Sequence, residues 1–159
     1  MEGQYYVTGR LPPGLFKDDC VFIDPTTRVV GAQKYATVVA SLFDAAHSRA
    51  DLLSIAPGGR GPGADEDDSP QTVVLRWRLE GRLALPGNPP VKAYTGTTTY
   101  SLDDGGAVVE QLERWDITAA DAFASSFLPS WAWRGAPPAP PAEVLRMQEQ
   151  GQGGVTIDY

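Results

Sequence analysis

The sequence predicts an α+β fold in which one strongly curved antiparallel sheet packs on helices. Three observations in the 159-residue chain lead to this prediction. Apolar residues recur at helical spacing between Gly31 and Asp44, and at alternate positions in the strands that follow. The turn signal Asp103-Asp104-Gly105-Gly106 joins the last two strands into a hairpin. Alternation along this hairpin separates an aromatic face, which we expect to cover the helices, from a polar face.

The N-terminal part of the chain predicts short elements. Residues 2–19 indicate a short helix, a break and a second helical turn that begins at a proline. Cys20–Ile23 is typical of a short strand, which stops at Asp24-Pro25 because the residue before a proline avoids the helical region. The next helix is amphipathic, with apolar residues three, four and seven positions apart, namely Tyr35, Val38, Val39, Leu42 and Phe43.

Two strands are expected before the hairpin. Ala50–Ala56 predicts the first, and the acidic segment from Pro57 to Pro70 predicts a loop. Thr72–Leu85 alternates apolar and charged residues, which predicts a long strand with one dry and one charged face.

After the hairpin, Thr118 is expected to cap a helix that ends near Pro129. The following segment is too rich in proline for a helix or an inner strand, and residues 142–150 predict a last short helix. We therefore divide the chain into an α+β domain of residues 1–130 and a Trp/Pro-rich C-terminal extension of residues 131–159.

The register of the hairpin assigns side chains to the two faces of the sheet. With Leu102 opposite Ala107, counting outward pairs Tyr100 with Val109, Thr98 with Gln111, Gly96 with Glu113 and Tyr94 with Trp115. One face is then aromatic with a few polar groups, as a pocket wall would be: Tyr94, Gly96, Thr98, Tyr100, Leu102, Val109, Gln111, Glu113, Trp115 and Ile117. The other face is polar apart from Val108 and Leu112, and it carries Thr95, Thr97, Thr99, Ser101, Glu110, Arg114 and Asp116.

Charge and composition exclude several classes of function. The formal net charge of −7, with an acidic cluster at Asp65–Asp68, argues against a nucleic-acid partner, which needs a basic patch. No apolar run approaches the roughly 20 residues of a membrane-spanning helix. Cys20 is the single cysteine and His47 the single histidine, so we expect no internal disulfide, no metal site and no cofactor.

Five short motifs, in this order and spacing, resemble a known superfamily. They are Phe22-Ile23-Asp24-Pro25, Gly31 with the helix after it, Arg76-Trp77, Gly96-Thr97-Thr98-Thr99-Tyr100 and Trp115-Asp116. From about Gly9 to Phe127 the chain resembles the nuclear transport factor 2-like superfamily, which includes SnoaL-like domains and ketosteroid isomerase. More closely, it resembles an uncharacterised SnoaL-like branch of plants, algae and cyanobacteria. The resemblance implies a cone-shaped α+β barrel, a pocket between sheet and helices, and frequent pairing through the outer sheet face, but no particular reaction.

The resemblance also implies where an active site would lie. Enzymes of this superfamily move a proton with a pocket carboxylate and stabilise the oxyanion with a tyrosine or a second acid. The catalytic candidates are Glu113 with Tyr94 and Tyr100, and Asp24 at the mouth. The ligand-binding candidates are Trp77, Tyr94, Thr98, Tyr100, Gln111, Glu113 and Trp115. Each has a structural alternative: Glu113 as a hydrogen-bond acceptor only, Asp24 as a turn residue, and the tryptophans as core.

Two surfaces are candidates for protein binding. The polar outer face, with Arg76, Arg78 and Arg114, is either solvent surface or an interface, including one between two copies of the chain. The segment with Trp131 and Trp133 suits an extended docking element, because a proline-rich chain loses little entropy on ordering. Alternatively, its tryptophans pack back over the pocket.

Three functions stay open at this point. The first hypothesis is a non-catalytic accessory protein that binds a protein partner and has a pocket for a small ligand. The photosynthetic branch would place it in the chloroplast, at a thylakoid complex such as a photosystem; otherwise we expect a soluble intracellular protein. The second hypothesis is an isomerase, cyclase or dehydratase that uses Glu113 with Tyr94 or Tyr100, although an Asp–His pair for dehydration is missing. The third is a carrier of a hydrophobic small molecule.

Overall fold

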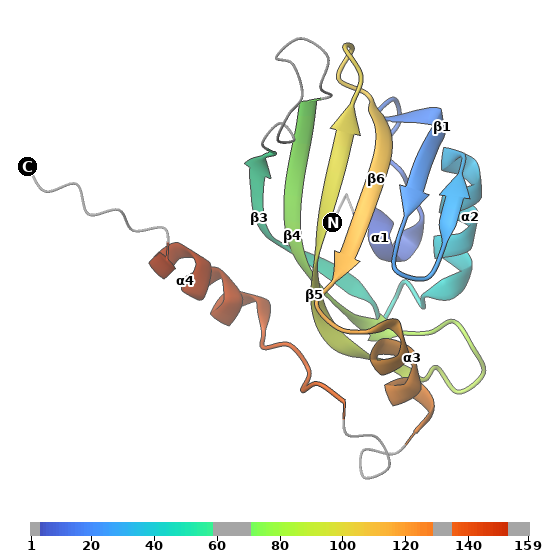
Figure 1. Ribbon diagram of the computed structural model, residues 1–159. Helices are drawn as coiled ribbons and strands as arrows, with labels where there is room; N and C mark the ends of the chain where they lie inside the picture. The colour runs from blue at the N-terminus through green and yellow to red at the C-terminus, as the bar shows by residue number, and fades with distance from the viewer. Residues whose placement is uncertain (1–3, 59–70, 129–134, 153–159) are drawn as a thin grey trace, which may run out of the picture.

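The computed structural model describes residues 4–58, 71–128 and 135–152. A curved six-stranded sheet has the strand order β2-β1-β6-β5-β4-β3 (Figure 1). The strands are β1 (Phe16–Ile23), β2 (Arg28–Val30), β3 (Arg49–Pro57), β4 (Gln71–Arg82), β5 (Pro90–Leu102) and β6 (Val108–Trp115), and the helices are α1 (Tyr5–Thr8), α2 (Ala32–Leu42), α3 (Ala119–Phe127) and α4 (Ala142–Gln152). The predicted α+β fold with a curved sheet on helices is confirmed. One pair of strands, β1 with β6, is parallel, and the other pairs are antiparallel.

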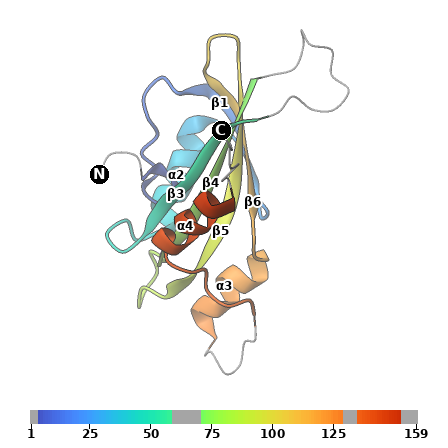
Figure 2. The ribbon, with the colours of Figure 1, turned by 90° about the vertical axis from the view of Figure 1, so that its left-hand side faces the viewer.

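The helices α1 and α2 cover one side of the sheet, which we call the inner face (Figure 2). The rings of Phe22 on β1 and Tyr35 on α2 stack at 3.9 Å and join these layers. Gly9 ends α1 with a φ of 68°. A Cβ at Gly9 would lie 2.2 Å from the carbonyl oxygen of Ala36, so this glycine lets α1 approach α2 closely.

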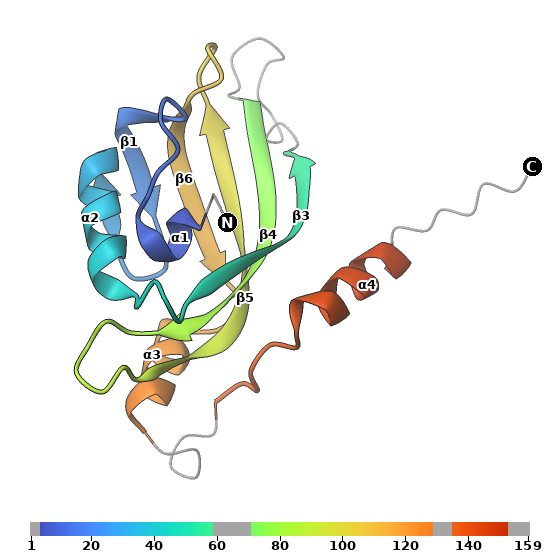
Figure 3. The same cartoon turned by 180° about the vertical axis from the view of Figure 1, so that it is seen from behind.

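The other two helices, α3 and α4, do not belong to the layer of α1 and α2. Thr118 caps α3 as predicted, because its hydroxyl accepts a hydrogen bond from the Asp121 amide at 3.1 Å. The helix α4 lies beyond the edge strand β3 and contacts it (Figure 3).

The N-terminal strand differs from its prediction. It begins at Phe16 rather than at Cys20, and it replaces the expected second helical turn. The charged residues Lys17, Asp18 and Asp19 are exposed, so this part of β1 lacks the apolar alternation that announces a strand. The short strand β2, which pairs Arg28–Val30 with β1, was not predicted.

The hairpin register is two residues away from the prediction. Trp115 stands opposite Gly96, Glu113 opposite Thr98 and Gln111 opposite Tyr100. Two features of the turn cause the difference. The Asp103 carboxylate accepts from the amides of Gly105 and Ala107, at 3.0 and 2.8 Å, which extends the turn to Ala107. A bulge then leaves Val109 without a partner on β5.

A slip of two residues preserves the face of each side chain, because side chains alternate with a period of two. Gln111, Glu113 and Trp115 therefore keep their predicted inner positions. The bulge changes which of two valines faces the core. Val108, which was predicted to face outward, pairs with Leu102 and is only 3% exposed. It takes the core position that was expected for Val109.

Candidate functional site

A tryptophan ring fills the space that the absent side chain of Gly96 leaves. A Cβ at Gly96 would lie 2.5 Å from Cη2 of Trp77, which stands beside it on β4. The missing side chain therefore makes room for Trp77, not for the Glu113 carboxylate or a ligand. Trp77 is 2% exposed, and its indole N–H donates to the Thr98 hydroxyl oxygen at 2.8 Å.

Three tyrosine hydroxyls meet beneath this tryptophan. The Tyr6 hydroxyl donates to the Thr98 oxygen at 2.8 Å and lies 2.5 Å from the Tyr100 hydroxyl. The Tyr100 hydroxyl also contacts the hydroxyl of Tyr5. Two of these tyrosines come from α1 and one from β5, so the cluster fixes the first helix to the middle of the sheet. Because the groups are bonded to one another, their burial carries little desolvation cost.

Gln111 connects this cluster to the carboxylate. Its side-chain oxygen accepts from the Tyr5 hydroxyl at 3.2 Å, and its amide nitrogen donates to Oε1 of Glu113 at 2.6 Å. The same nitrogen lies 3.3 Å from the hydroxyl of Tyr35, which in turn donates to Oε1 of Glu113 at 3.4 Å. Gln111 is completely buried, and this continuous network explains how a large polar side chain is tolerated there.

Glu113 is the carboxylate at the end of the network. Its Oε2 accepts from the indole N–H of Trp115 at 3.4 Å. Burial raises the pKa of Glu113 to about 7; the hydrogen bonds from Trp115, Gln111 and Tyr35 oppose this rise, and the charge of Asp24 adds to it. Glu113 is therefore present in both protonation states near neutral pH.

Neutral donors surround this carboxylate. Burial raises the pKa of Tyr6 to about 12, and it raises the pKa values of Tyr94 and Tyr100 further. The nearby charge of Glu113 contributes to each of these increases. These hydroxyls accordingly keep their protons across the physiological range and can donate hydrogen bonds to a ligand or an oxyanion.

Glu113 opens into a cavity of about 130 Å³ between the inner face, α2 and α3. Its polar groups are Tyr6, Asp24, Thr26, Thr27, Tyr35, Tyr94 and Glu113, and its apolar wall is Val29, Val38, Val39, Leu42, Phe43, Leu79, Val91, Trp115, Ala122 and Phe123. Pockets for drug-sized ligands usually measure about 300–1,000 Å³. The cavity therefore suits a small molecule with one polar group, and a larger ligand would need α2 or α3 to move.

The structure divides the predicted ligand-binding residues into two groups. Tyr94, Glu113 and Trp115 line this cavity. Trp77, Thr98, Tyr100 and Gln111 are buried behind its wall, where they hold one another and the helix α1 in place. Tyr100 instead lines a second, apolar hollow of about 290 Å³, together with Tyr5, Leu15, Ile55, Val73, Leu75, Leu102, Gly106 and Val108.

Asp24 lies at the rim and organises a turn. Its Oδ1 accepts from the amide and hydroxyl of Thr26, both at 2.6 Å, and from the amide of Thr27 at 2.9 Å. These bonds shape the connection from β1 to β2, which is the structural role that the sequence left open as an alternative. Asp24 still faces the cavity and acts on Glu113 through its charge.

The sequence did not single out the tyrosines of the helices as members of the site. Tyr5, Tyr6 and Tyr35 belong to the network, yet a tyrosine on the apolar stripe of a helix usually indicates core packing alone. The available signal was the crowding of polar inner-face positions at Thr98, Tyr100 and Gln111, because buried polar groups in a sheet need partners from the covering helices.

The three outer-face arginines have different surroundings. Arg114 is exposed. Arg76 forms ion pairs with Glu149 of α4 at 3.1 Å and Asp116 at 3.6 Å. Arg78 is only 5% exposed, because residues of the C-terminal segment cover it. Trp131 and Trp133, the other predicted partner-binding residues, lie outside the described residues.

The described part of the chain has neither a metal-binding cluster nor a membrane-spanning helix. Residues 4–58, 71–128 and 135–152 contain no group of three His, Cys, Asp or Glu side chains placed to hold a metal ion. Within the same ranges, no helix has the length and apolarity needed to cross a bilayer.

Comparisons with known proteins agree with this architecture. Residues 10–111 match the family described as uncharacterized conserved protein (DUF2358).

The chain is similar to an NTF2-like protein of unknown function from Exiguobacterium sp. 255-15, at 18% identity and a TM-score of 0.49, over 64% of this chain and 77% of that one. It is also similar to a hypothetical protein with a ketosteroid isomerase-like fold from Catenulispora acidiphila DSM 44928, in complex with trimethylamine, at 14% identity and a TM-score of 0.52, over 75% and 81% of the two chains. No curated protein matches the chain. The likeness to the Catenulispora structure shows that the fold is NTF2-like.

Proposed function

Because the chain belongs to the DUF2358 family, whose description names no reaction, we propose a function from the geometry of the inner face. The protein is a non-catalytic accessory protein that binds a protein partner and holds a small, largely apolar molecule in the cavity at Glu113. The two parts of this proposal have different support and separate tests.

The observation that carries the proposal is that Glu113 already accepts hydrogen bonds at both oxygens and faces only a small cavity. A catalytic carboxylate needs a lone pair directed at its substrate and space for that substrate. Here both carboxylate oxygens already accept hydrogen bonds from Gln111, Tyr35 and Trp115, and the cavity measures only about 130 Å³. This arrangement favours holding a small molecule over converting a large one.

Native mass spectrometry of the protein as isolated tests the ligand. We expect a bound small molecule that is lost in Glu113→Gln and retained in Glu110→Gln, because these glutamates lie on opposite faces of β6. Retention of the same molecule by Glu113→Gln, or no bound molecule in any variant, would contradict this part of the proposal. A ligand that binds without any protein partner would instead support the simple carrier.

The partner is the second part of the proposal. The resemblance to a branch of plants, algae and cyanobacteria supports a chloroplast location and a thylakoid complex, and the exposed Arg114 marks outer surface open to contact. The chain, isolated from native membranes with mild detergent, is expected to migrate with a large complex. Recovery as a solitary monomer under the same conditions would contradict it.

One observation favours a second candidate function, an isomerase or cyclase. Burial raises the pKa of Glu113 to about 7, which suits a general base, and the neutral Tyr94 hydroxyl lines the same cavity as an oxyanion donor. This function predicts a rate that depends on a group with a pKa near 7. Glu113→Gln would lower that rate by about 10²–10⁴-fold, and Glu110→Gln would not.

A further inference from the structure

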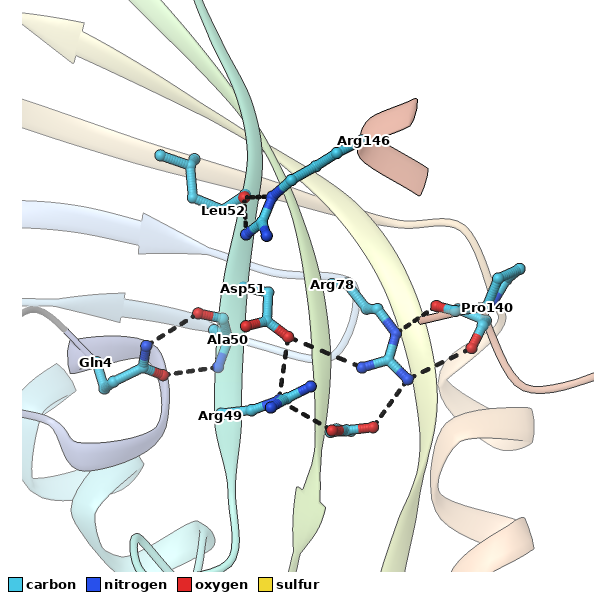
Figure 4. A network of polar contacts seen from close by, with 10 residues as sticks. Gln4, Arg49, Ala50, Asp51, Leu52, Arg78, Pro140 and Arg146 are labelled. Atoms are coloured by element: carbon cyan, nitrogen blue, oxygen red, sulfur yellow. Dashed lines mark hydrogen bonds and ion pairs between the residues drawn. The ribbon is translucent and has the colours of Figure 1, made fainter. Parts of the chain in front are cut away.

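The C-terminal segment occupies the outer face of the sheet like a bound peptide. Residues 136–149 run from β5 past β4 to β3, and Figure 4 shows their contacts at Pro140 and Arg146. The Ala139 amide donates to the carbonyl oxygen of Ala93 at 2.8 Å. The ladder between β6 and β5 ends at Gly96, and the Asp116 amide still donates to the Thr95 carbonyl at 2.9 Å. From Pro90 to Tyr94, β5 therefore has a backbone edge that β6 does not cover and that an added chain can use.

Charged side chains of the sheet and of α3 hold the backbone of this segment. Arg78 donates through Nε to the Pro140 carbonyl at 2.6 Å and through a terminal nitrogen to the Ala139 carbonyl at 3.4 Å. Lys92 donates to the Ala136 carbonyl at 2.7 Å, and Asp121 accepts from the Ala136 amide at 2.8 Å. Recognition is therefore mainly of backbone groups, with the forked guanidinium as its centre.

Acidic residues of the sheet hold Arg78 in position beneath the segment. Glu80 lies 2.8 Å from its guanidinium and Asp51 lies 3.9 Å away, while Arg49 bridges both of these acids (Figure 4). These contacts come from β3 and β4 alone. The fork is thus oriented by the sheet, and its remaining donors are available to any extended chain that presents two carbonyl groups.

The helix α4 is attached mainly by polar contacts, and Ala142 at its start is buried, with 1% exposure. Arg146 donates two hydrogen bonds, at 3.0 and 2.7 Å, to the Leu52 carbonyl, and Glu149 pairs with Arg76. Val144 and Met147 of α4 are 37% and 64% exposed. The Arg76–Glu149 pair is partly exposed, and ion pairs that water reaches contribute little free energy each, so this attachment can be exchanged. Covalent linkage, through its high effective concentration, keeps the segment in place.

We propose that the outer face of β3–β5 is a binding site for an extended, proline-containing segment of a partner protein, which displaces residues 136–149 of the chain itself. The proposal rests on the proposed function, in which the protein binds a partner. Residues 136–141, Ala-Pro-Pro-Ala-Pro-Pro, are the intramolecular example of this ligand class. Proline suits the site because it favours the extended conformation and leaves carbonyl groups free as acceptors.

Peptide exchange in the full chain tests this site. A protease recognition sequence is inserted after Leu128, the chain is cut there, and a fluorescent peptide of residues 135–152 is added to the cut complex. We expect saturable binding to the cut protein and at least tenfold weaker binding to the uncut one. The reversed-sequence peptide, with the same composition, is expected not to bind, and Glu149→Gln in the peptide is expected to weaken binding a few-fold.

Arginine variants identify the centre of the site. Arg78→Lys is expected to weaken peptide binding at least tenfold, because a lysine cannot supply the fork. Arg28→Lys, at an exposed position of β2 on the far edge of the sheet, stays within twofold of the parent. Equal binding of the forward and reversed peptides, or unchanged binding by a folded Arg78→Lys, would overturn the proposal. If Arg78→Lys does not fold, the reversed and Glu149→Gln peptides decide the question with the parent protein.

Two further outcomes separate this site from the proposed function. If the uncut chain forms dimers and Arg78→Lys dissociates them, the occupant of the site is a second copy of the chain. That result would overturn the proposal of a foreign partner. Specific peptide binding without any large complex in native membranes would support the site and contradict the accessory function, because the peptide assay involves no natural partner.

Discussion

The two faces of the sheet satisfy their polar groups in different ways. On the inner face, Gln111 bonds to Glu113, tyrosines from the covering helices bond to Tyr100, Gln111 and Glu113, and Glu113 faces a small cavity. On the outer face, Arg78 bonds mainly to acidic side chains and to the backbone of a segment from the far end of the chain. The difference predicts a rigid inner face and, under the proposal above, an outer face whose covering segment can be replaced by another chain.

The largest expected loss of stability comes from a substitution on the inner face. Trp77→Ala removes a ring that is 2% exposed and fills the space at Gly96, so we expect the free energy of unfolding to fall by about 3–5 kcal/mol. Arg76→Ala, on the neighbouring residue of the opposite face, is expected to cost less than about 1 kcal/mol. Urea unfolding measures both values, and similar losses for the two variants would contradict the comparison.

The next effect concerns the anchor of the outer face. Arg78→Ala removes one of the two arginines that pair with Glu80 and Asp51. It also removes the guanidinium that binds the C-terminal segment. We expect a loss of about 3 kcal/mol in unfolding free energy. Hydrogen exchange at the Ala139 amide should also accelerate, because that amide is bonded to Ala93. Unchanged protection at Ala139 would show that the segment is held independently of Arg78.

The third prediction concerns the pH dependence of stability that Glu113 causes. The pKa of Glu113 rises from 4.5 in the unfolded chain to about 7 on folding, so folding takes up a proton in this interval. The stability from this proton is complete below about pH 4.5 and is lost as the pH rises through 7. Glu113→Gln should remove that loss and be about 1–2 kcal/mol more stable than the parent at pH 8, after allowing for partial solvent screening.

Unfolding at pH 4.5 and pH 8 measures this difference for Glu113→Gln, with Glu110→Gln as the control on the opposite face. We expect the control to keep the pH dependence of the parent. An equal effect of both variants would assign it to net charge instead of burial.

The smallest effect distinguishes two buried tyrosines. Tyr100→Phe removes the hydroxyl that contacts both Tyr5 and Tyr6, and we expect a loss of about 1–2 kcal/mol. Tyr94 has no hydrogen-bond partner for its hydroxyl among the described residues, so Tyr94→Phe should cost less than about 0.5 kcal/mol. Thermal or urea unfolding resolves the two cases, and the reverse order would contradict the network.

Alternation along the hairpin allowed the faces of the sheet to be predicted, but not the contacts on them. Period-two alternation survived a two-residue error in register, so Tyr94, Tyr100 and Glu113 were placed correctly on one face. The bulge at Val109 depends on the Asp103 turn, and no local pattern announces it.

Long-range contacts account for the rest of what could not be predicted. The bond from Tyr5 to Tyr100 spans 95 residues, and the bond from Arg78 to Pro140 spans 62. Each partner has an ordinary local role, as a helix tyrosine or a surface arginine. Only the packing of α1 and the path of the C-terminal segment bring them together.

The most direct test of the account is a titration of the Glu113 side-chain carboxyl by NMR in the intact protein. A desolvated carboxyl on the inner face, facing the cavity, predicts a pKa of about 7 for this group. A value near 4.5, the ordinary value of a solvated glutamate, would mean that water reaches Glu113 freely and would contradict the closed inner site.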